Sequence, residues 1–184
     1  MLFTEGELRA KVQFRETVTA KKADQILTES RDLTSSNFDV FLSHSILDKE
    51  LIAGAKLALE ERGLSVYVDW ITDPQLDRTR VSTGTASHLR RRMRQCQMLV
   101  YVHSENAAVS KWCPWELGYF DGMRRGNVFI MPVASNIKYG FEGQEYLGLY
   151  PYLVRTSDRA NVLVMEANVP AFIEQAKSAI LTRK

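Results

Sequence analysis

The segment SKWCPWEL, residues 110–117, brings an indole and a carboxylate to a spacing that could serve a ligand. Trp112 and Glu116 are four residues apart, so their side chains share one face if the segment is helical. A flat indole would then sit beside a fixed negative charge. Pro114 is typical of a helix's first turn, which would place Glu116 near the positive end of the helix dipole. We therefore take this segment as the candidate site.

The same residues also have a purely structural interpretation. Glu116 would be third in a helix whose N-cap is Cys113, where it would tie down a free backbone N–H group. Trp112 and Trp115 could pack in the core, since an apolar stripe already runs along the predicted helix. We expect core packing for one tryptophan and assign Trp112 to the site.

Two further pairs of polar side chains close predicted strands. Ser43 and His44 end the first apolar run, and Asp69 and Trp70 end the second. In a parallel sheet these ends lie at the same edge as the segment 104–112, and ligands gather at that edge. His44 could equally be a satisfied structural histidine, and Asp69 and Trp70 could cap and pack the loop that follows. The residues alone leave both interpretations open.

Apolar runs of strand-forming residues alternate with helical periodicity from residue 38 onward. Helices between strands imply parallel pairing, and near-continuously apolar strands imply helices on both sheet faces. We therefore expect a flavodoxin-like, doubly wound α/β fold with a five-stranded parallel sheet. The first helix would be capped by Asp48 and stopped by Gly63. The predicted strands are 38–44, 64–70, 97–104, 127–133 and 161–165, and the predicted helices are 48–63, 83–96, 115–126 and 169–184.

Two stretches stand outside this alternation. Residues 1–36 are predicted to be a helical extension with a Ser/Thr-rich linker, because apolar residues recur loosely at helical spacing. These residues are Leu8, Val12, Phe14, Val18 and Ile26. The main domain is expected at 37–184. Within it, residues 134–154 are irregular, and their aromatics predict a packed loop with a short helix.

Composition narrows the class of partner. Lys and Arg number 24 against 22 Asp and Glu, so no overall charge selects nucleic acid or an acidic membrane. The arginine-rich segment 89–96 is expected to be a solvated helix face; the alternative, phosphate or nucleic-acid binding, lacks interleaved aromatics. The histidines and cysteines have no zinc-ligand spacing, so no metal site is expected. Without a secretory signal or an apolar run of roughly 20 residues, we expect a reduced, cytoplasmic protein.

Three segments carry a resemblance to a known family. FDVFLSHSILDKE, GLSVYVDW and CQMLVYVHSENAAVSKWCPWEL resemble the first three strands, with their following segments, of a Toll/interleukin-1 receptor (TIR) domain of the bacterial stand-alone kind. SKWCPWEL matches the family's S-x-W-C-x-x-E-L signature and follows a predicted strand. The resemblance covers about residues 37–183, and the 134–154 insertion departs from the common pattern.

The resemblance implies an activity. TIR domains with a glutamate at this place resemble NAD glycohydrolases, which release nicotinamide and leave ADP-ribose or a cyclic isomer. On that pattern Glu116 is the catalytic residue and Trp112 stacks on the nicotinamide. Ser43 and His44 would contact the dinucleotide. NAD+ is then the substrate, and no cofactor is implied.

The other candidate contacts come from the segment after the second predicted strand. Asp69 and Trp70 would lie at the substrate rim. Because no glycine-rich phosphate loop occurs, the diphosphate would be held by loops, with Arg78 as the substrate-binding candidate and Arg80 beside it.

Two classes of function follow from the resemblance. One is an enzyme of bacterial anti-phage defence, whose nucleotide product reaches a separately encoded effector. The other is a non-catalytic module that assembles with its own kind. In both, self-association would use the loop 71–82. The feature that discriminates them is Glu116, which TIR adaptors generally lack.

Overall fold

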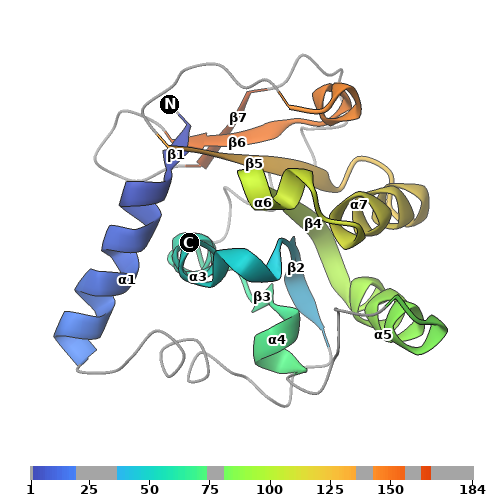
Figure 1. Cartoon of the computed structure of the whole chain (residues 1–184), viewed down its shortest axis with the longest axis horizontal. Helices are drawn as coiled ribbons and strands as arrows, with labels where there is room; N and C mark the ends of the chain where they lie inside the picture. The colour runs from blue at the N-terminus through green and yellow to red at the C-terminus, as the bar shows by residue number, and fades with distance from the viewer. Residues whose placement is uncertain (1, 20–36, 74–80, 136–142, 156–162, 167–184) are drawn as a thin grey trace.

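The computed structural model describes residues 2–19, 37–73, 81–135, 143–155 and 163–166 (Figure 1). The predicted closing helix at 169–184, the linker and the loop centre at 74–80 lie outside the described residues. Among the described helices, none is long and apolar enough to cross a membrane.

Five parallel strands form the body of the sheet, in the order β3-β2-β4-β5-β6. The expected flavodoxin-like fold is therefore confirmed. These strands are β2 (Phe38–Ser43), β3 (Val66–Tyr67), β4 (Cys96–His103), β5 (Val128–Ala134) and β6 (Tyr152–Arg155).

The fifth parallel strand differs from the predicted one. The predicted strand 161–165 corresponds to β7 (Leu163–Glu166), which pairs antiparallel with β6 at the sheet edge. The fifth parallel place belongs to β6, which overlaps the end of the stretch 134–154 predicted to be irregular. That stretch also contains the short helix η2 (Glu145–Leu149). β6 begins after Pro151, whose carbonyl accepts the Ile130 N–H at 2.9 Å. Such a short strand gives no alternation that marks it before its partner is known.

Helices cover both faces of the sheet, as predicted (Figure 1). On one face α1 (Glu5–Thr19) and α3 (Lys49–Glu60) pack over alternate strand positions such as Val40 and Leu42. On the other face α5 (Thr83–Arg94) and α7 (Trp112–Met123) pack over the intervening positions, such as Phe41. Successive strand residues therefore serve two separate cores.

The N-terminal segment contributes a strand and a helix to this body. β1 (Phe3–Thr4) pairs with the end of β5, and Leu8 and Val12 of α1 are buried. Thr4 and Glu7 form a reciprocal capping box, with bonds of 3.1 and 3.3 Å. Two other residues used to predict this helix, Phe14 and Val18, are exposed.

The second predicted strand is shorter than expected. Of residues 64–70, only Val66–Tyr67 pair, and Asp69–Thr72 form the short helix α4. The Asp69 carboxylate accepts the Trp70 N–H at 2.8 Å, which favours the turn. Asp69 and Trp70 therefore begin a helix and do not close a strand.

Two helix starts also differ from expectation. Asp48 stands at the N-cap of α3, but its carboxylate makes no capping bond. The helix α7 begins at Trp112, three residues before the predicted start at 115. The Ser110 hydroxyl accepts the Trp112 and Cys113 N–H groups at 3.3 Å each, so Ser110 caps the helix and Cys113 does not. At the other end of α3, Gly63 adopts a φ of 74°, as its predicted role as a stop requires.

Candidate functional site

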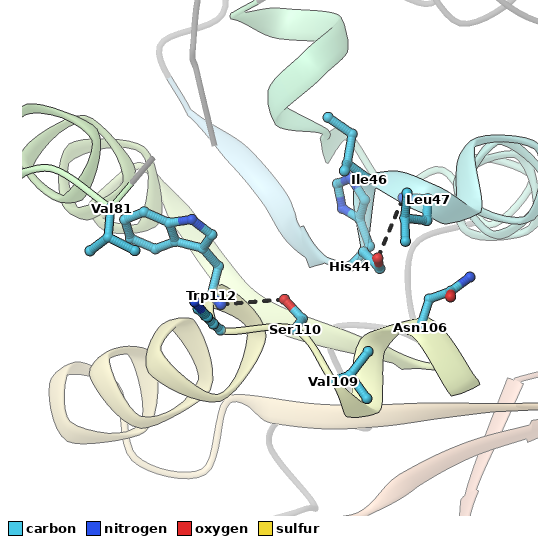
Figure 2. A pocket seen from close by; sticks show the side chains of 10 residues that line it. His44, Ile46, Leu47, Val81, Asn106, Val109, Ser110 and Trp112 are labelled. Carbon is cyan, nitrogen blue, oxygen red and sulfur yellow. Dashed lines mark hydrogen bonds between the residues drawn. The ribbon is translucent and has the colours of Figure 1, made fainter. Parts of the chain in front are cut away.

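A cavity of about 590 Å³ opens where the loops after β2 and β4 meet the start of α7 (Figure 2). This is the carboxyl edge of the parallel strands, where ligands are expected. Its walls come from segments far apart in the chain. The lining residues are His44, Ser45, Ile46, Leu47, Val81, Asn106, Val109, Ser110, Lys111 and Trp112.

Trp112 forms one side of this cavity. Its indole points toward Val81, and His44, Ile46 and Leu47 stand on the opposite side (Figure 2). The Trp112 ring meets Trp115 edge to face, with centroids 5.4 Å apart. Trp115 does not line the cavity. Of the two tryptophans, the one assigned to the site is thus the one at the wall.

Glu116 lies one helical turn beyond Trp112 and is completely buried, with 0% of its surface exposed. Ser43 Oγ donates a hydrogen bond of 2.6 Å to Glu116 Oε2. Neither Glu116 nor Ser43 is among the residues that line the cavity. Each is close in the chain to a lining residue, because Ser43 adjoins His44 and Glu116 is one helical turn from Trp112. Because α7 begins at Trp112, Glu116 lies beyond the three residues that open the helix. Neither first-turn capping nor the full effect of the helix dipole applies to it.

His44 is a buried wall residue whose ring nitrogens both contact protein groups. Its Nδ1 donates to the Leu42 carbonyl at 2.7 Å, and its Nε2 accepts the Trp70 indole N–H at 2.8 Å. These bonds describe a neutral imidazole with its proton on Nδ1. The Asp69 Oδ1 atom lies 3.3 Å from Nε2. Asp69 and Trp70 are thus adjacent to His44 and are not part of the cavity lining. Arg78 lies outside the described residues.

A polar bridge joins the two loops at the cavity's far wall. Asp48 ends the short helix η1 (Ile46–Asp48), and Asn106 belongs to α6 (Glu105–Ala108). Asp48 accepts hydrogen bonds from Ser104 Oγ at 2.5 Å and from Asn106 Nδ2 at 2.7 Å. These residues follow β2 and β4, and their position after predicted strands was the only sequence signal that could have found them.

The mouth of the cavity is apolar. Ile46, Leu47, Val81 and Val109 are all exposed, from 42% to 79%. Exposed aliphatic groups gathered around one opening favour a planar or apolar ligand part, or a protein neighbour. Lys111, also exposed, adds a positive charge at the rim.

A second polar cluster lies where α4 leads into the loop 71–82. Arg92 of α5 donates two bonds of 2.7 Å to the Asp73 carboxylate, and Tyr67 donates a third of 2.7 Å. His88 Nε2 lies 2.8 Å from the same carboxylate. Burial by itself would raise the pKa of Asp73, but the bonds from Arg92, His88 and Tyr67 hold it well below its usual range.

The arginine-rich helix is therefore only partly the solvated face that was predicted. Arg92 binds Asp73, and the Arg90 guanidinium lies over the Trp115 ring at 5.3 Å. Arg91 and Arg94 are exposed. The spacing of the arginines along the helix cannot show which of them faces a partner that is distant in the chain.

No metal centre is present among the described residues, which contain no group of three or more His, Cys, Asp or Glu side chains placed to hold an ion.

Comparison with known proteins identifies the family. The model of the TIR domain matches residues 40–156. A protein of Bacillus cereus (strain MSX-D12) named "Probable 3' cyclic ADP-D-ribose synthase ThsB'" is 45% identical over 163 residues, which are 84% of this chain and 83% of that protein. A candidate cyclic ADP-D-ribose synthase of Cytobacillus dafuensis, TIR2, is 36% identical over 83 residues, 45% of this chain and 22% of its own length.

The family match covers β2 from Val40 onward, the strands β3 to β6, the residues that line the cavity and the whole of α7. The close relative extends the similarity to most of the chain. The resemblance inferred from the signature around Trp112 and Glu116 is confirmed, and the chain belongs to the TIR domain family.

Proposed function

We propose that this protein cleaves the bond between nicotinamide and ribose in NAD+ and releases nicotinamide together with a cyclic ADP-ribose or ADP-ribose. The observation that carries this activity is a buried carboxylate, Glu116, which is bonded to Ser43 and lies one helical turn from Trp112, a residue that lines the cavity. The relative that shares 45% identity is named a cyclic ADP-D-ribose synthase, and it supports the cyclic product.

The chemistry requires little from the protein besides charge and shape. The C1′–N bond breaks, and its electron pair leaves with nicotinamide, which departs neutral from a cationic ring. No acid is needed to protonate the leaving group. The ribose becomes an oxocarbenium ion, and a carboxylate beside it stabilises that transition state more than the ground state. Glu116 is assigned this role.

Ser43 is assigned to position that carboxylate. Burial of an ionised group costs free energy unless hydrogen bonds compensate, and bonds from hydroxyl groups to carboxylates are short and strong. The 2.6 Å bond from Ser43 fits this class. When NAD+ enters, its ribose hydroxyls would join or replace Ser43 at Glu116, since catalytic hydrogen bonds often reach their working geometry only with substrate bound.

Trp112 is assigned to stack on the nicotinamide and to exclude water. The oxocarbenium ion is captured either by water, which gives ADP-ribose, or by a nucleophilic atom of the same molecule, which gives a ring. In both cases the attacking group then loses its proton to solvent. A dry wall favours ring closure.

The remaining assignments concern the rim. His44 is proposed to contact the dinucleotide through its ring face, because both ring nitrogens are engaged. Asp69 and Trp70 would support the substrate through His44. Arg78 is proposed to hold the diphosphate. In this reaction NAD+ is consumed as substrate, and no cofactor enters.

The biological setting is part of the same proposal. We propose self-association through the loop 71–82; Val81, near its end, is 72% exposed at the cavity mouth. The product would act in the cytoplasm on a separately encoded effector in anti-phage defence. The second candidate, a non-catalytic assembly module, is favoured only by the same exposed apolar mouth.

Incubation of the purified full-length protein with NAD+, followed by quantification of nicotinamide, tests the activity. Glu116→Gln preserves size and removes the charge, and loss of one such preorganised group costs about 10²- to 10³-fold in rate. Glu105→Gln is the matched control, because Glu105 is an exposed carboxylate on α6 beside the cavity. Equal rates for wild type and Glu116→Gln would contradict the assignment. No release of nicotinamide by a concentrated, folded protein would favour the assembly module.

A further inference from the structure

An aromatic ladder runs outward from the cavity along α7. Trp112 meets Trp115 edge to face at 5.4 Å and an interplanar angle of 81°. Trp115 then stacks on Tyr119 with centroids 5.8 Å apart and ring planes within 16°. The three residues are spaced three and four apart, so they form one stripe of the helix.

The outer end of this ladder is fixed by a different helix. The Arg90 guanidinium of α5 lies 5.3 Å from the Trp115 centroid and 5.6 Å from the Tyr119 centroid. A guanidinium over an aromatic face is attractive, more so when partly desolvated, and Arg90 is half-buried. Arg90 therefore ties the ladder to α5.

The inner end of the ladder is at the wall of the site. Trp112 is the first residue of α7, where the helix backbone offers neighbours on one side only. Its indole points toward Val81, which lies on the same side of the cavity and is itself exposed (Figure 2). Edge contact with Trp115 is thus a direct restraint on the plane of the indole.

We propose that Trp115 and Arg90 are positioning residues that hold the Trp112 indole at the cavity wall and so set the ratio of cyclic to linear product. This inference rests on the proposed function. The described ring and guanidinium contacts of Trp115 and Arg90 are with one another, with Trp112 and with Tyr119, so we expect bond cleavage itself to be little affected. A loosened indole would admit water to the oxocarbenium ion, and capture by water would compete with ring closure.

Two substitutions and a control test this role in the full-length protein. Trp115→Leu keeps apolar bulk but removes the ring edge, and Arg90→Gln removes only the guanidinium. Arg94→Gln is the control, because Arg94 is exposed on the same helix, and the described bond from Arg124 is accepted by its backbone carbonyl, which the substitution keeps. Trp115→Phe keeps an aromatic ring, so its ratio of cyclic to linear product should lie between those of Trp115→Leu and the wild type.

The product ratio, measured by mass spectrometry after complete turnover, is the primary readout. Edge-to-face pairs contribute energies that correspond to about a 2- to 10-fold change in ratio. We expect the cyclic fraction relative to linear product to fall by about that factor in Trp115→Leu and about 2-fold in Arg90→Gln. The KM for NAD+ should rise while kcat for nicotinamide release stays within about 2-fold of wild type. An unchanged ratio in both variants, or a wild type that makes only linear product, would overturn the proposal.

A second measurement works without turnover. The chain has three tryptophans, so 5-fluorotryptophan labelling gives three fluorine resonances, which single Phe substitutions assign. We expect the Trp112 resonance to shift and broaden in Arg90→Gln and to stay in place in Arg94→Gln. A Trp112 resonance with the same position and width in wild type, Arg90→Gln and Trp115→Leu would overturn the positioning role, even if the protein proved inactive on NAD+. Failure of the activity alone would leave this spectroscopic result intact.

Discussion

The two faces of the sheet are covered by helix pairs that are held in different ways. Over one face, α1 and α3 approach so closely that a Cβ added at Gly54 would lie 2.3 Å from the Leu8 carbonyl oxygen. Over the other face, α5 and α7 meet where the Arg90 guanidinium lies over the rings of Trp115 and Tyr119. Both pairs also bury apolar side chains, but a close backbone approach is found in the first pair and a guanidinium over aromatic rings in the second.

The two faces also differ in their relation to the candidate site. On the first face, α1 and α3 are in close contact, and charged side chains lie at the edge of that contact. No residue of α1 or α3 lines the cavity. The face with α5 and α7 carries Trp112 and Glu116. Substitutions between α1 and α3 should change unfolding alone, whereas substitutions on the second face can change catalysis as well as unfolding.

The largest effect on stability is expected where α5 binds the loop. Asp73→Asn leaves the buried end of Arg92 without its anionic partner, and loss of one member of a buried ion pair costs about 3–5 kcal/mol. Urea unfolding of the variant and the wild type measures this. Asp121→Asn is the control, because that carboxylate takes a single described bond of 3.2 Å from Tyr150. Equal losses of unfolding free energy in both variants would show that the Asp73 cluster stabilises the fold no more than an ordinary carboxylate does.

The same cluster predicts the acid response. The pKa of Asp73 in the folded protein lies below its ordinary value of 3.8. Its stabilising contribution is therefore complete above that value and is lost as the pH falls toward the folded-state pKa. Unfolding free energies measured from pH 5 down to pH 2 should fall less steeply in Asp73→Asn than in wild type. Parallel curves would contradict this assignment.

A smaller effect is expected from the close contact on the first face. Gly54→Ala forces α1 away from α3, and overpacking of this kind costs about 1–3 kcal/mol. Gly118→Ala is the matched control on α7, since its added Cβ would meet nothing within 4 Å. Replacing an exposed helical glycine with alanine stabilises by about 0.5–1 kcal/mol. Gly54→Ala with wild-type stability, or with lost nicotinamide release per folded molecule, would break the separation of the two faces.

The smallest effect concerns the charges around α1. Lys11 pairs with Glu61 at 2.7 Å, and both side chains are partly exposed. Such pairs contribute about 0.2–1 kcal/mol and weaken in salt. Lys11→Gln should therefore lower the unfolding free energy by no more than that, with the difference vanishing at 1 M salt. A larger loss that disappears in salt would mean that charge, and not backbone contact, attaches α1.

The elements predicted best are those whose burial is periodic along the chain. The apolar run of β4 and the helical stripe of α3 suffice to place both, because each buries its own pattern against the sheet. β6 and the shortened β3 were not predictable in the same way. Their extent depends on how far a neighbouring strand reaches, and no local pattern records that.

The candidate site shows the same division. The spacing of Trp112 and Glu116 predicts that they share a helix, and they do. The partner of Glu116 is Ser43, which is 73 residues away, and no periodicity links the two. Serine is a common N-cap residue, so the capping role of Ser110 could have been predicted. It was not assigned, because the predicted helix began at residue 115. Residue chemistry could therefore nominate the site, but only the fold supplies its contacts.

The most direct test of the account is a double-mutant cycle on Ser43 and Glu116, with nicotinamide release from NAD+ as the measured rate. If the hydroxyl acts only by positioning the carboxylate, Ser43→Ala should slow release by about 10-fold, within the range typical of groups that orient a catalytic residue. The double variant should then be no slower than Glu116→Gln alone, because residues that act as a unit are not additive. Fully additive losses, or a Ser43→Ala variant as fast as wild type, would contradict the central claim.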